Sequence, residues 1–250
     1  MNFSDYIRFR KVCENMLEQG TLFGVGVGPG DPELMTFKAA RTIKEADVIA
    51  LPKTDEQYIT ALEIIKAVVD ISQKEIIEIY LPMTRDEDTL RTSHQKAGLQ
   101  LAELLNQGKN IAFLTLGDPS IYSTYIYIHN WLLHKGFQVQ LIAGVPSFCA
   151  VAAKLNMSLC KGAEPLHIIP ASYHHNDDYL DWDGTKILMK SGKSLKKVID
   201  TLQTKGLIEN SSMVERCGMD GEKVYKNLSD VNPGSSYFST IVVKDKEKKQ

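Results

Sequence analysis

Short apolar segments alternate with segments of helical periodicity along this chain, and that alternation constrains the fold more than any other feature. Strands are predicted from residue 21 onward and over 47–51, 76–81, 111–116 and 138–142. Helices are predicted over 36–46, 61–69, the later part of 84–107, a segment ending at 135, and 144–155. Because a parallel strand needs a crossover, usually a helix, to reach its neighbour, this order predicts α/β units around a mostly parallel sheet.

The same pattern restarts after about residue 158. Strands are expected over 166–170, 186–190, 212–215 and 237–243, and the clearest helix over 193–205. We therefore expect two α/β domains, over 21–158 and 159–250. A helical extension over 1–20 precedes them, and a solvated tail ends the chain.

The helical period also predicts which side chains of two segments face inward. In the extension they are Tyr6, Phe9, Cys13 and Met16 or Leu17. In the helix over 36–46 they are Phe37, Ala40, Ile43 and Ala46.

Composition excludes some classes of protein. Of the 250 residues, 43% are apolar and 24% are charged, which is ordinary for a soluble folded protein. The net charge of -2 excludes a nucleic-acid binder held by bulk positive charge. No apolar run approaches the ~18 residues of a membrane span, and the N-terminus is charged where a signal peptide is apolar. We expect a cytoplasmic protein without a membrane or nucleic-acid partner.

The cysteines and histidines form no pattern of metal ligands. Cys13, Cys149, Cys160 and Cys217 make no CxxC pair, so we expect reduced and mostly buried thiols. His174 and His175 stand in a polar cluster that is typical of a loop. No metal site is expected.

Three turns rich in glycine and proline follow predicted strands, over 24–32, 116–123 and 143–147. The first is not a dinucleotide fingerprint, because Pro29 or Asp31 stands where GxGxxG needs its last glycine. Open parallel sheets bind ligands at the carboxyl ends of their strands, so three turns at one edge predict a pocket. For the first turn, a tight turn without a ligand remains the alternative.

The segment Ser191-Gly192-Lys193-Ser194 does not complete a phosphate-binding loop. The motif needs a glycine five residues before Gly192, where Ile187 stands. We expect a helix to start here, with Ser191 or Ser194 near its cap. Hydrolase, zinc-protease and kinase motifs are absent as well.

The three turns resemble signatures of one family. GVGVGPGDPELMTFKAA, LGDPSIYS and GVPSFCAVAAKLNMSL are similar, in this order, to signatures of the tetrapyrrole (cobalamin and siroheme) methyltransferases, and the resemblance spans residues 21–243. GDPSIYST, GVPSFCAVAA and VERCGMDGE most resemble the members that methylate carbon 20 of precorrin-2 or cobalt-factor II in cobalamin biosynthesis. The resemblance implies two α/β domains, S-adenosylmethionine in the cleft between them, and a homodimer.

It also implies cofactor contacts, mostly through backbone groups. The matching positions are Pro29, Leu116, Gly117, Asp118, Ile121, Pro146, Ser147, Met189, Cys217 and Gly218. In relatives that methylate uroporphyrinogen, an Asp is proposed as a base at the position that Pro52 occupies here. Their mechanism does not transfer, which counts against the siroheme branch.

The chemistry needs few side chains. The methyl group of a sulfonium is already activated, so the attacking carbon must mainly be held in line with it. A base only removes a proton afterwards, and we assign no catalytic residue. The substrate's carboxylates suggest a basic rim of Lys53, Arg85 and Arg91, although an ordinary solvated face explains each equally well. Tyr122 and Tyr125 either flank the macrocycle or belong to the core.

The leading hypothesis is a methyltransferase acting on carbon 20 of a corrin precursor. Methylation at another position of a corrin or siroheme precursor is the alternative within the family. A non-catalytic module that binds a tetrapyrrole or a nucleotide is the alternative outside it. Binding of S-adenosylhomocysteine without a pyrrole separates a methyltransferase from a pure pyrrole binder. The broken glycine fingerprint disfavours a dehydrogenase.

Overall fold

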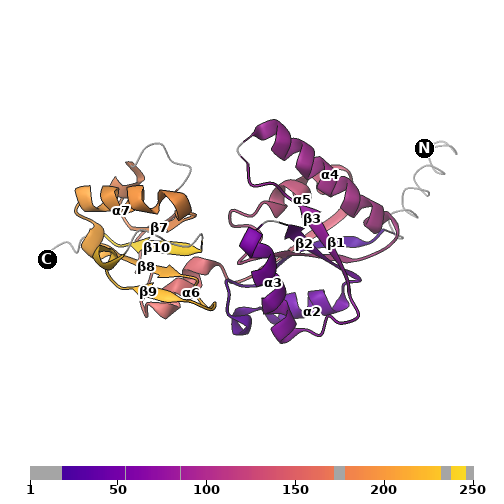
Figure 1. The fold of residues 1–250 in the computed structure, drawn as a ribbon, viewed down its shortest axis with the longest axis horizontal. Helices are drawn as coiled ribbons and strands as arrows, with labels where there is room; N and C mark the ends of the chain where they lie inside the picture. The colour runs from indigo at the N-terminus through magenta and orange to yellow at the C-terminus, as the bar shows by residue number, and fades with distance from the viewer. Residues whose placement is uncertain (1–18, 54, 85, 172–177, 232–237, 246–250) are drawn as a thin grey trace. The chain divides into compact units, whose positions relative to one another are not determined.

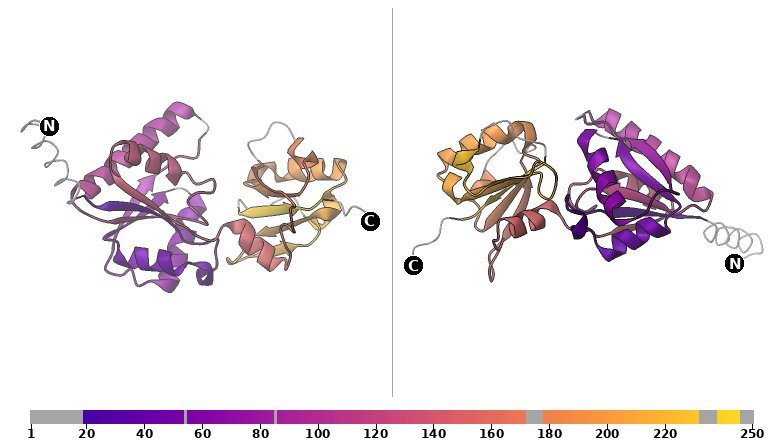
Figure 2. Two further views of the ribbon diagram at one scale, coloured as in Figure 1. Left: turned by 180° about the vertical axis from the view of Figure 1, so that it is seen from behind. Right: turned by 60° about the horizontal axis from the view of Figure 1, so that its bottom comes forward.

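The computed structural model describes residues 19–53, 55–84, 86–171, 178–231 and 238–245. Residue contacts divide the chain into two compact units (Figures 1 and 2). Unit 1 comprises Met1–Gly28 and Pro32–Val145, and unit 2 comprises Pro29–Asp31 and Pro146–Gln250. The predicted extension lies almost wholly outside the described residues, as does most of the expected tail.

Unit 1 is built on a parallel sheet, as the alternation predicted. Its strands are β1 (Thr21–Gly26), β2 (Val48–Lys53), β3 (Glu75–Tyr80), β4 (Ile111–Thr115) and β5 (Gln138–Ile142). Their order across the sheet is β3-β2-β4-β1-β5, and every pairing is parallel. All five carboxyl ends therefore lie along one edge, where the glycine turns begin.

Helices cover both faces of this sheet. They are α2 (Phe37–Glu45), α3 (Asp55–Val68), α4 (Glu87–Asn106) and α5 (Tyr125–His134), with a 3-10 turn η1 (Pro32–Leu34) before α2. Successive strand residues point to opposite faces. Thus Ile49 packs in the core beneath α2 and α3, whereas Val48 and Ala50 pack in the core beneath α4 and α5. Both faces are buried, as parallel sheets require.

Helix α2 departs from one prediction. Thr36 caps it by accepting a hydrogen bond from the Ala39 N–H at 3.1 Å. Ile43 and Ala46 are buried as predicted, but the side chain of Phe37 is 97% exposed. Phe37 precedes the buried Ala39 by two residues, about 200° around the helix, so it lies off the buried face. The prediction for Phe37 was wrong.

Unit 2 contains a mixed sheet. Its strands are β6 (Leu166–Pro170), β7 (Thr185–Met189), β8 (Ser211–Glu215), β9 (Lys223–Tyr225) and β10 (Ser239–Val243), in the order β6-β7-β10-β8-β9. Among these described strands, β6 and β7 pair in parallel, and the other three pairings are antiparallel. The other elements are α6 (Ser147–Lys154), α7 (Leu195–Thr204), η2 (Asp178–Asp181), η3 (Gly192–Ser194), η4 (Ile208–Asn210) and η5 (Leu228–Asp230).

The division between the units falls earlier in the chain than the expected boundary after residue 158. Helix α6 packs against β8 and β10 and is therefore counted with unit 2. The helix expected from residue 193 begins as η3 and continues as α7 from Leu195. Ser194 occupies its N-cap position without a capping bond, and the buried Ser191 hydroxyl instead pairs with that of Ser239 at 2.8 Å.

Two cysteines depart from the expected burial. Among the described thiols Cys217 is buried, but Cys149 and Cys160 are exposed. Cys149 lies in the first turn of α6, and Cys160 lies in the connection between α6 and β6. Cys13 lies outside the described residues. In the described part of the chain, none of the helices combines the length and apolarity needed to cross a bilayer.

Candidate functional site

Three glycine turns meet at the carboxyl edge of the sheet in unit 1. Gly117 donates its N–H to the Gly28 carbonyl at 2.7 Å and accepts the Gly28 N–H at 3.3 Å. A Cβ on Gly144 would lie 2.2 Å from the Gly117 carbonyl oxygen, and one on Gly26 would lie 2.7 Å from the Gly144 nitrogen. These glycines are therefore required for the turns after β1, β4 and β5 to pack backbone against backbone.

The carboxylate of Asp118 joins two of these turns. Its Oδ2 accepts the Gly144 N–H at 2.9 Å. Its Oδ1 accepts the Ser120 N–H at 2.8 Å and also the Ser120 hydroxyl. The backbone carbonyl of Asp118 accepts the Ile121 N–H at 3.2 Å, which tightens the turn after β4. Both carboxylate oxygens thus bind the chain itself.

The remainder of the first turn belongs to unit 2. A Cβ on Gly30 would lie 2.5 Å from the Cys217 carbonyl oxygen. Gly218 has a φ of 73°, and a Cβ there would lie 2.7 Å from the Asp31 nitrogen. The segment Pro29–Asp31 therefore packs closely against the turn after β8. Pro29, Cys217 and Gly218 come together within this one unit.

An ion pair supports the turn at Gly218. The Gly218 N–H donates to Glu222 Oε2 at 2.8 Å, and Glu222 Oε1 pairs with Lys154 Nζ at 2.8 Å. Burial acts to raise the pKa of Glu222, but the Gly218 N–H and the Lys154 ammonium outweigh it, so this pKa is lowered. The hydrogen bond and charge of Glu222 raise the pKa of Lys154.

Cys217 is kept as a neutral thiol. Burial, helped by the charge of Glu222, raises its pKa to about 11. A thiolate is the nucleophilic form of cysteine, so this side chain is unreactive near neutral pH.

Ser147 and Met189 are both linked to Thr240 on β10. The Ser147 hydroxyl lies 3.3 Å from that of Thr240, and Met189 is the strand partner of Thr240. Pro146 precedes Ser147 and occupies the N-cap position of α6. These residues form a second cluster within unit 2.

The residues expected to hold the cofactor thus form two groups. The group in unit 1 consists of Leu116, Gly117, Asp118 and Ile121. The group in unit 2 consists of Pro29, Pro146, Ser147, Met189, Cys217 and Gly218.

Two of the three basic residues suggested for the substrate already have acidic partners. Lys53, at the end of β2, forms an ion pair with Glu78. Arg91 pairs with Asp88 at 2.9 Å on the exposed side of α4. Exposed pairs of this kind contribute little, so a ligand can compete for either cation. Arg85 lies outside the described residues.

The two tyrosines differ. Tyr125 is 1% exposed, lies directly under Gly24, and packs against Phe113 with ring centroids 5.0 Å apart. Tyr125 is therefore a core residue and does not flank the macrocycle. Burial raises the pKa of its hydroxyl. Tyr122 is 38% exposed, and burial raises its pKa as well.

Sequence reasoning missed a backbone feature beside the candidate residues. Four described residues other than glycine have a positive φ: Tyr122 (49°), Asn156 (52°), Lys190 (55°) and Arg216 (51°). Three of them are direct chain neighbours of candidate cofactor residues, namely of Ile121, Met189 and Cys217. Strained backbone of this kind clusters at functional sites. No sequence signal marks it, because glycine is the residue expected in such turns.

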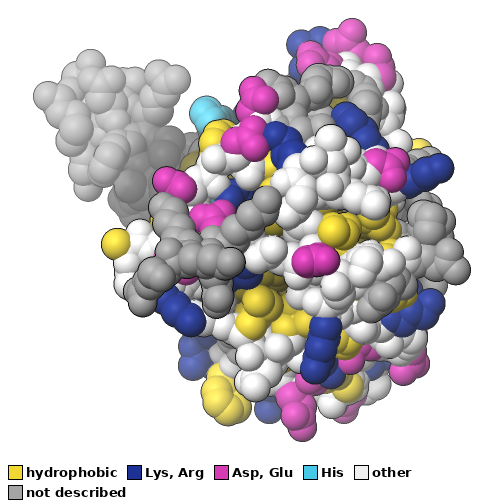
Figure 3. Space-filling model, turned by 90° about the vertical axis from the view of Figure 1, so that its left-hand side faces the viewer, with side chains coloured by type: hydrophobic (Ala, Val, Ile, Leu, Met, Phe, Trp, Pro, Cys, Tyr) yellow, Lys and Arg dark blue, Asp and Glu magenta, His cyan; other side chains and the backbone are white. Residues whose placement is uncertain are grey.

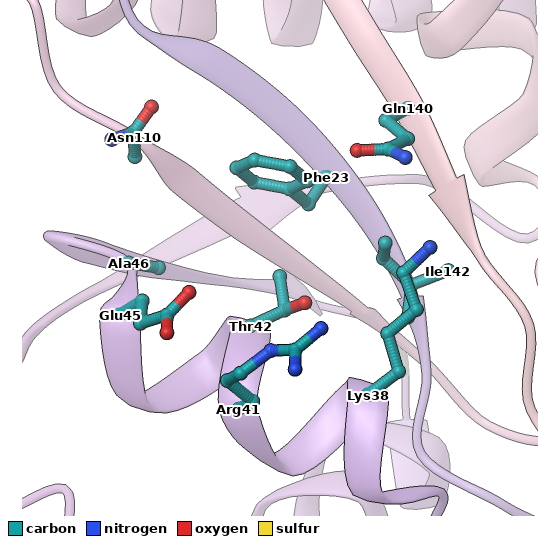
Figure 4. Close-up of a pocket in the computed structure, with 9 residues that line it drawn as sticks. All are labelled: Phe23, Lys38, Arg41, Thr42, Glu45, Ala46, Asn110, Gln140 and Ile142. Carbon is teal, nitrogen blue, oxygen red and sulfur yellow. The ribbon is translucent and has the colours of Figure 1, made fainter.

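A cavity of about 220 Å³ opens elsewhere on unit 1, between α2 and strands β1 and β5 (Figure 4). Phe23, Lys38, Arg41 and Gln140 are among its lining residues. None of the candidate cofactor or substrate residues lines it.

Comparison with known proteins places the chain in a family. The model of the tetrapyrrole (corrin/porphyrin) methylases matches residues 21–231. A probable cobalt-precorrin-2 C(20)-methyltransferase of Methanocaldococcus jannaschii is 32% identical over 229 residues, which are 89% of this chain and 95% of that protein. A cobalt-precorrin-2 C(20)-methyltransferase of Salmonella typhimurium is 28% identical over 237 residues, which are 90% of this chain and 96% of that protein.

A solved structure has the same fold. Uroporphyrin-III C-methyltransferase from Thermus thermophilus, in complex with S-adenosylhomocysteine, aligns with a TM-score of 0.65 and 20% identity. The alignment covers 90% of this chain and 92% of that one. These matches confirm the resemblance drawn from the three turns. The chain belongs to the tetrapyrrole (corrin/porphyrin) methylases.

Proposed function

We propose that this protein transfers a methyl group from S-adenosylmethionine to carbon 20 of precorrin-2 or cobalt-factor II, a step of cobalamin biosynthesis. One observation carries the proposal. Two relatives from distant organisms, both named for methylation at C(20), match about nine tenths of this chain and more than nine tenths of their own length. Pro52, at the position where the uroporphyrinogen relatives are expected to have an Asp, also speaks against the siroheme branch.

The two groups of candidate residues would hold the cofactor. In unit 1, Gly117 and Asp118 fix the turn after β4 against its neighbours, so the backbone of Leu116–Ile121 is preorganised for a ligand. In unit 2, Gly30 and Gly218 allow Pro29–Asp31 to lie against the turn after β8. The donors and acceptors of fixed backbone turns suit a ligand that carries a ribose, an adenine and an amino acid.

The chemistry also requires that no reactive nucleophile other than the substrate lie beside the methyl group. S-adenosylmethionine, when bound, supplies an activated methyl group on a sulfonium. A thiolate beside it would compete with the substrate for that methyl group. The pKa of Cys217, raised to about 11, keeps this thiol in the protonated form, which is a poor nucleophile. The proton released from carbon 20 passes to water, and no described residue is assigned as its base.

The carboxylates of the substrate would bind to individual cationic side chains, because the protein as a whole is not positively charged. The net charge is -2, and on the face seen in Figure 3 the described Lys and Arg side chains are interspersed with Asp and Glu. The proposed substrate contacts are Lys53, Arg91 and Tyr122. Arg85 is proposed as a further contact from the sequence alone. Tyr125 is not proposed as a substrate contact, because its side chain is buried in the core of unit 1.

The test is an anaerobic assay with S-adenosylmethionine in which precorrin-2 and cobalt-factor II are offered separately. Mass and the position of the new methyl group are measured. A single methyl group at carbon 20 is the expected product, and the preferred substrate decides between the metal-free and the cobalt route. A methyl group at another position would replace this function by the alternative within the family. Binding of pyrrole without binding of S-adenosylhomocysteine would indicate a non-catalytic module.

We also propose that the protein acts as a homodimer in the cytoplasm. The family resemblance supports the dimer, and the small, soluble substrate and cofactor support the compartment. Sedimentation velocity at micromolar concentration measures whether the protein is a dimer. A monomer that is fully active at that concentration would contradict it.

A further inference from the structure

Lys190 is held in a backbone conformation that glycine would adopt at lower cost. Its φ is 55°, in the left-handed region where a residue with a Cβ is strained. Two of the other residues with positive φ have a local reason for it. Asn156 follows helix α6, and Asn is well tolerated in this conformation at a helix end. Arg216 donates its Nε to the Asp220 carbonyl at 2.7 Å and so closes its own turn.

The strain at Lys190 is fixed from both sides. The preceding residue, Met189, ends β7, pairs with β10, and accepts the Ala171 N–H at 2.8 Å. The following residue, Ser191, is fully buried and binds the Ser239 hydroxyl at 2.8 Å. These contacts hold the chain on both sides of Lys190. Its side chain leaves the chain at the carboxyl end of β7, next to a candidate cofactor residue.

The side chain of Lys190 is also partly buried. Burial lowers its pKa, whereas the cations suggested by the sequence, Lys53 and Arg91, lie at exposed positions. A cation that has lost part of its water interacts more strongly with an anion than an exposed one does. A lysine at a strained and partly desolvated position is suited to binding an anionic ligand.

We propose that Lys190 binds a carboxylate of the bound ligand and so determines its affinity. The proposal rests on the proposed function, because carboxylates are what the tetrapyrrole substrate and the cofactor have in common. The many acetate and propionate groups of the tetrapyrrole favour it as the source. Three variants of Lys190 separate the roles of charge and backbone. Lys190→Met removes the charge at similar length, Lys190→Arg keeps it, and Lys190→Gly removes both the side chain and the strain.

Two binding measurements test the proposal without the methyl transfer. The probes are uroporphyrin I, an octacarboxylic porphyrin followed by fluorescence, and S-adenosylhomocysteine, followed by calorimetry. Lys190→Met should weaken uroporphyrin binding about ten- to hundredfold and reduce its dependence on salt, because one charged contact is lost. Lys190→Arg should retain most of the affinity. Lys190→Gly should bind as weakly as Lys190→Met while unfolding at the same or a higher temperature.

Asn156→Gly is the matched control. It relieves the same left-handed conformation in the same unit but should leave both affinities unchanged. Weaker binding of S-adenosylhomocysteine alone by Lys190→Met would identify the carboxylate as that of the cofactor. Wild-type affinity of Lys190→Met for both probes would overturn the proposal, as would a wild-type protein that binds neither. A wild type that binds uroporphyrin through Lys190 but forms no methylated product would contradict only the proposed function.

Discussion

At the scale of single residues, Asp118 shows how one carboxylate can hold two turns of the chain together. Its two oxygens accept hydrogen bonds from two different turns, at Ser120 and at Gly144. The partners are two backbone N–H groups and the Ser120 hydroxyl, and all three donate to the carboxylate oxygens. The sequence identified Asp118 as a site residue, but only the structure shows that its side chain binds the chain itself.

Asp118→Asn changes the volume of the side chain very little, but it should disturb the two turns that the carboxylate joins. The new amide group would direct N–H donors at a backbone N–H and leave it unsatisfied, a cost of about 1–3 kcal/mol. We expect weaker binding of S-adenosylhomocysteine, by about tenfold, in a protein that still folds, as measured by calorimetry and circular dichroism. Ser120→Ala, which removes only the hydroxyl donor, should have a smaller effect. Equal affinity in Asp118→Asn and the wild type would show that the joined turns do not shape the cofactor site.

Phe37 and Ile43 provide a second test at this scale, because they lie on different sides of the same helix. Phe37 is 97% exposed and Ile43 is fully buried. Phe37→Ser should change the free energy of unfolding by about 0.5 kcal/mol or less, whereas Ile43→Ala should reduce it by about 2–5 kcal/mol. Urea denaturation measures both. A large loss in Phe37→Ser would mean that its ring is covered in solution.

At the scale of elements, the ion pair between α6 and the turn after β8 links two pieces of the candidate site. Lys154 is on α6, and Glu222 also accepts the N–H of Gly218. Because the pKa of Glu222 is lowered in the folded state, this carboxylate stabilises the fold above its ordinary pKa of about 4.5. Its contribution is lost as the pH falls through the lower, folded-state value.

Glu222→Gln should therefore lower the unfolding temperature by about 2 °C at pH 7, since the pair is partly exposed. The difference from the wild type should shrink as the pH falls below about 4.5 and vanish once Glu222 is protonated in both states. Thermal melts at a series of pH values measure this. A difference that stays constant down to pH 3 would exclude an electrostatic origin.

Most elements were predictable from the sequence, as was the parallel pairing of the strands in unit 1. Strands β5 and β6 have the predicted bounds, and most of the other predicted elements lie within a few residues of their positions. Strand β9 was missed, because its three residues are too few to show an alternation. The antiparallel pairings of unit 2 were missed as well, since an apolar segment looks the same in either direction. The turns of the site were found through glycine and proline, whereas Lys190 has no such marker.

At the scale of the whole molecule, the chain passes between the two units three times, and a proline begins each new stretch. The junctions are Gly28–Pro29, Asp31–Pro32 and Val145–Pro146. Proline fixes its own φ and restricts the residue before it, so these junctions have few conformations. The candidate cofactor residues are divided between the units that the junctions connect.

On the proposed function, S-adenosylhomocysteine contacts both groups of candidate residues, and it should then stabilise both units. At a hundred times its dissociation constant, S-adenosylhomocysteine would add about 2.7 kcal/mol to the stability of whatever it binds. Differential scanning calorimetry should show every unfolding transition moving to higher temperature when it is added. A transition that stays in place would assign the cofactor to one unit alone. Asn156→Gly serves as the control, because it should leave the ligand-induced shift unchanged.

The segment Pro29–Asp31 has a consequence for how the gene can evolve, because it belongs to unit 2 but is encoded before most of unit 1. A gene fragment that begins at Pro146 encodes α6 and the whole mixed sheet, yet it lacks the three residues that lie against Gly218. Recombination that exchanged either half between relatives would have to preserve a tripeptide encoded far upstream. The two units can therefore diverge in sequence, but they must do so as one gene.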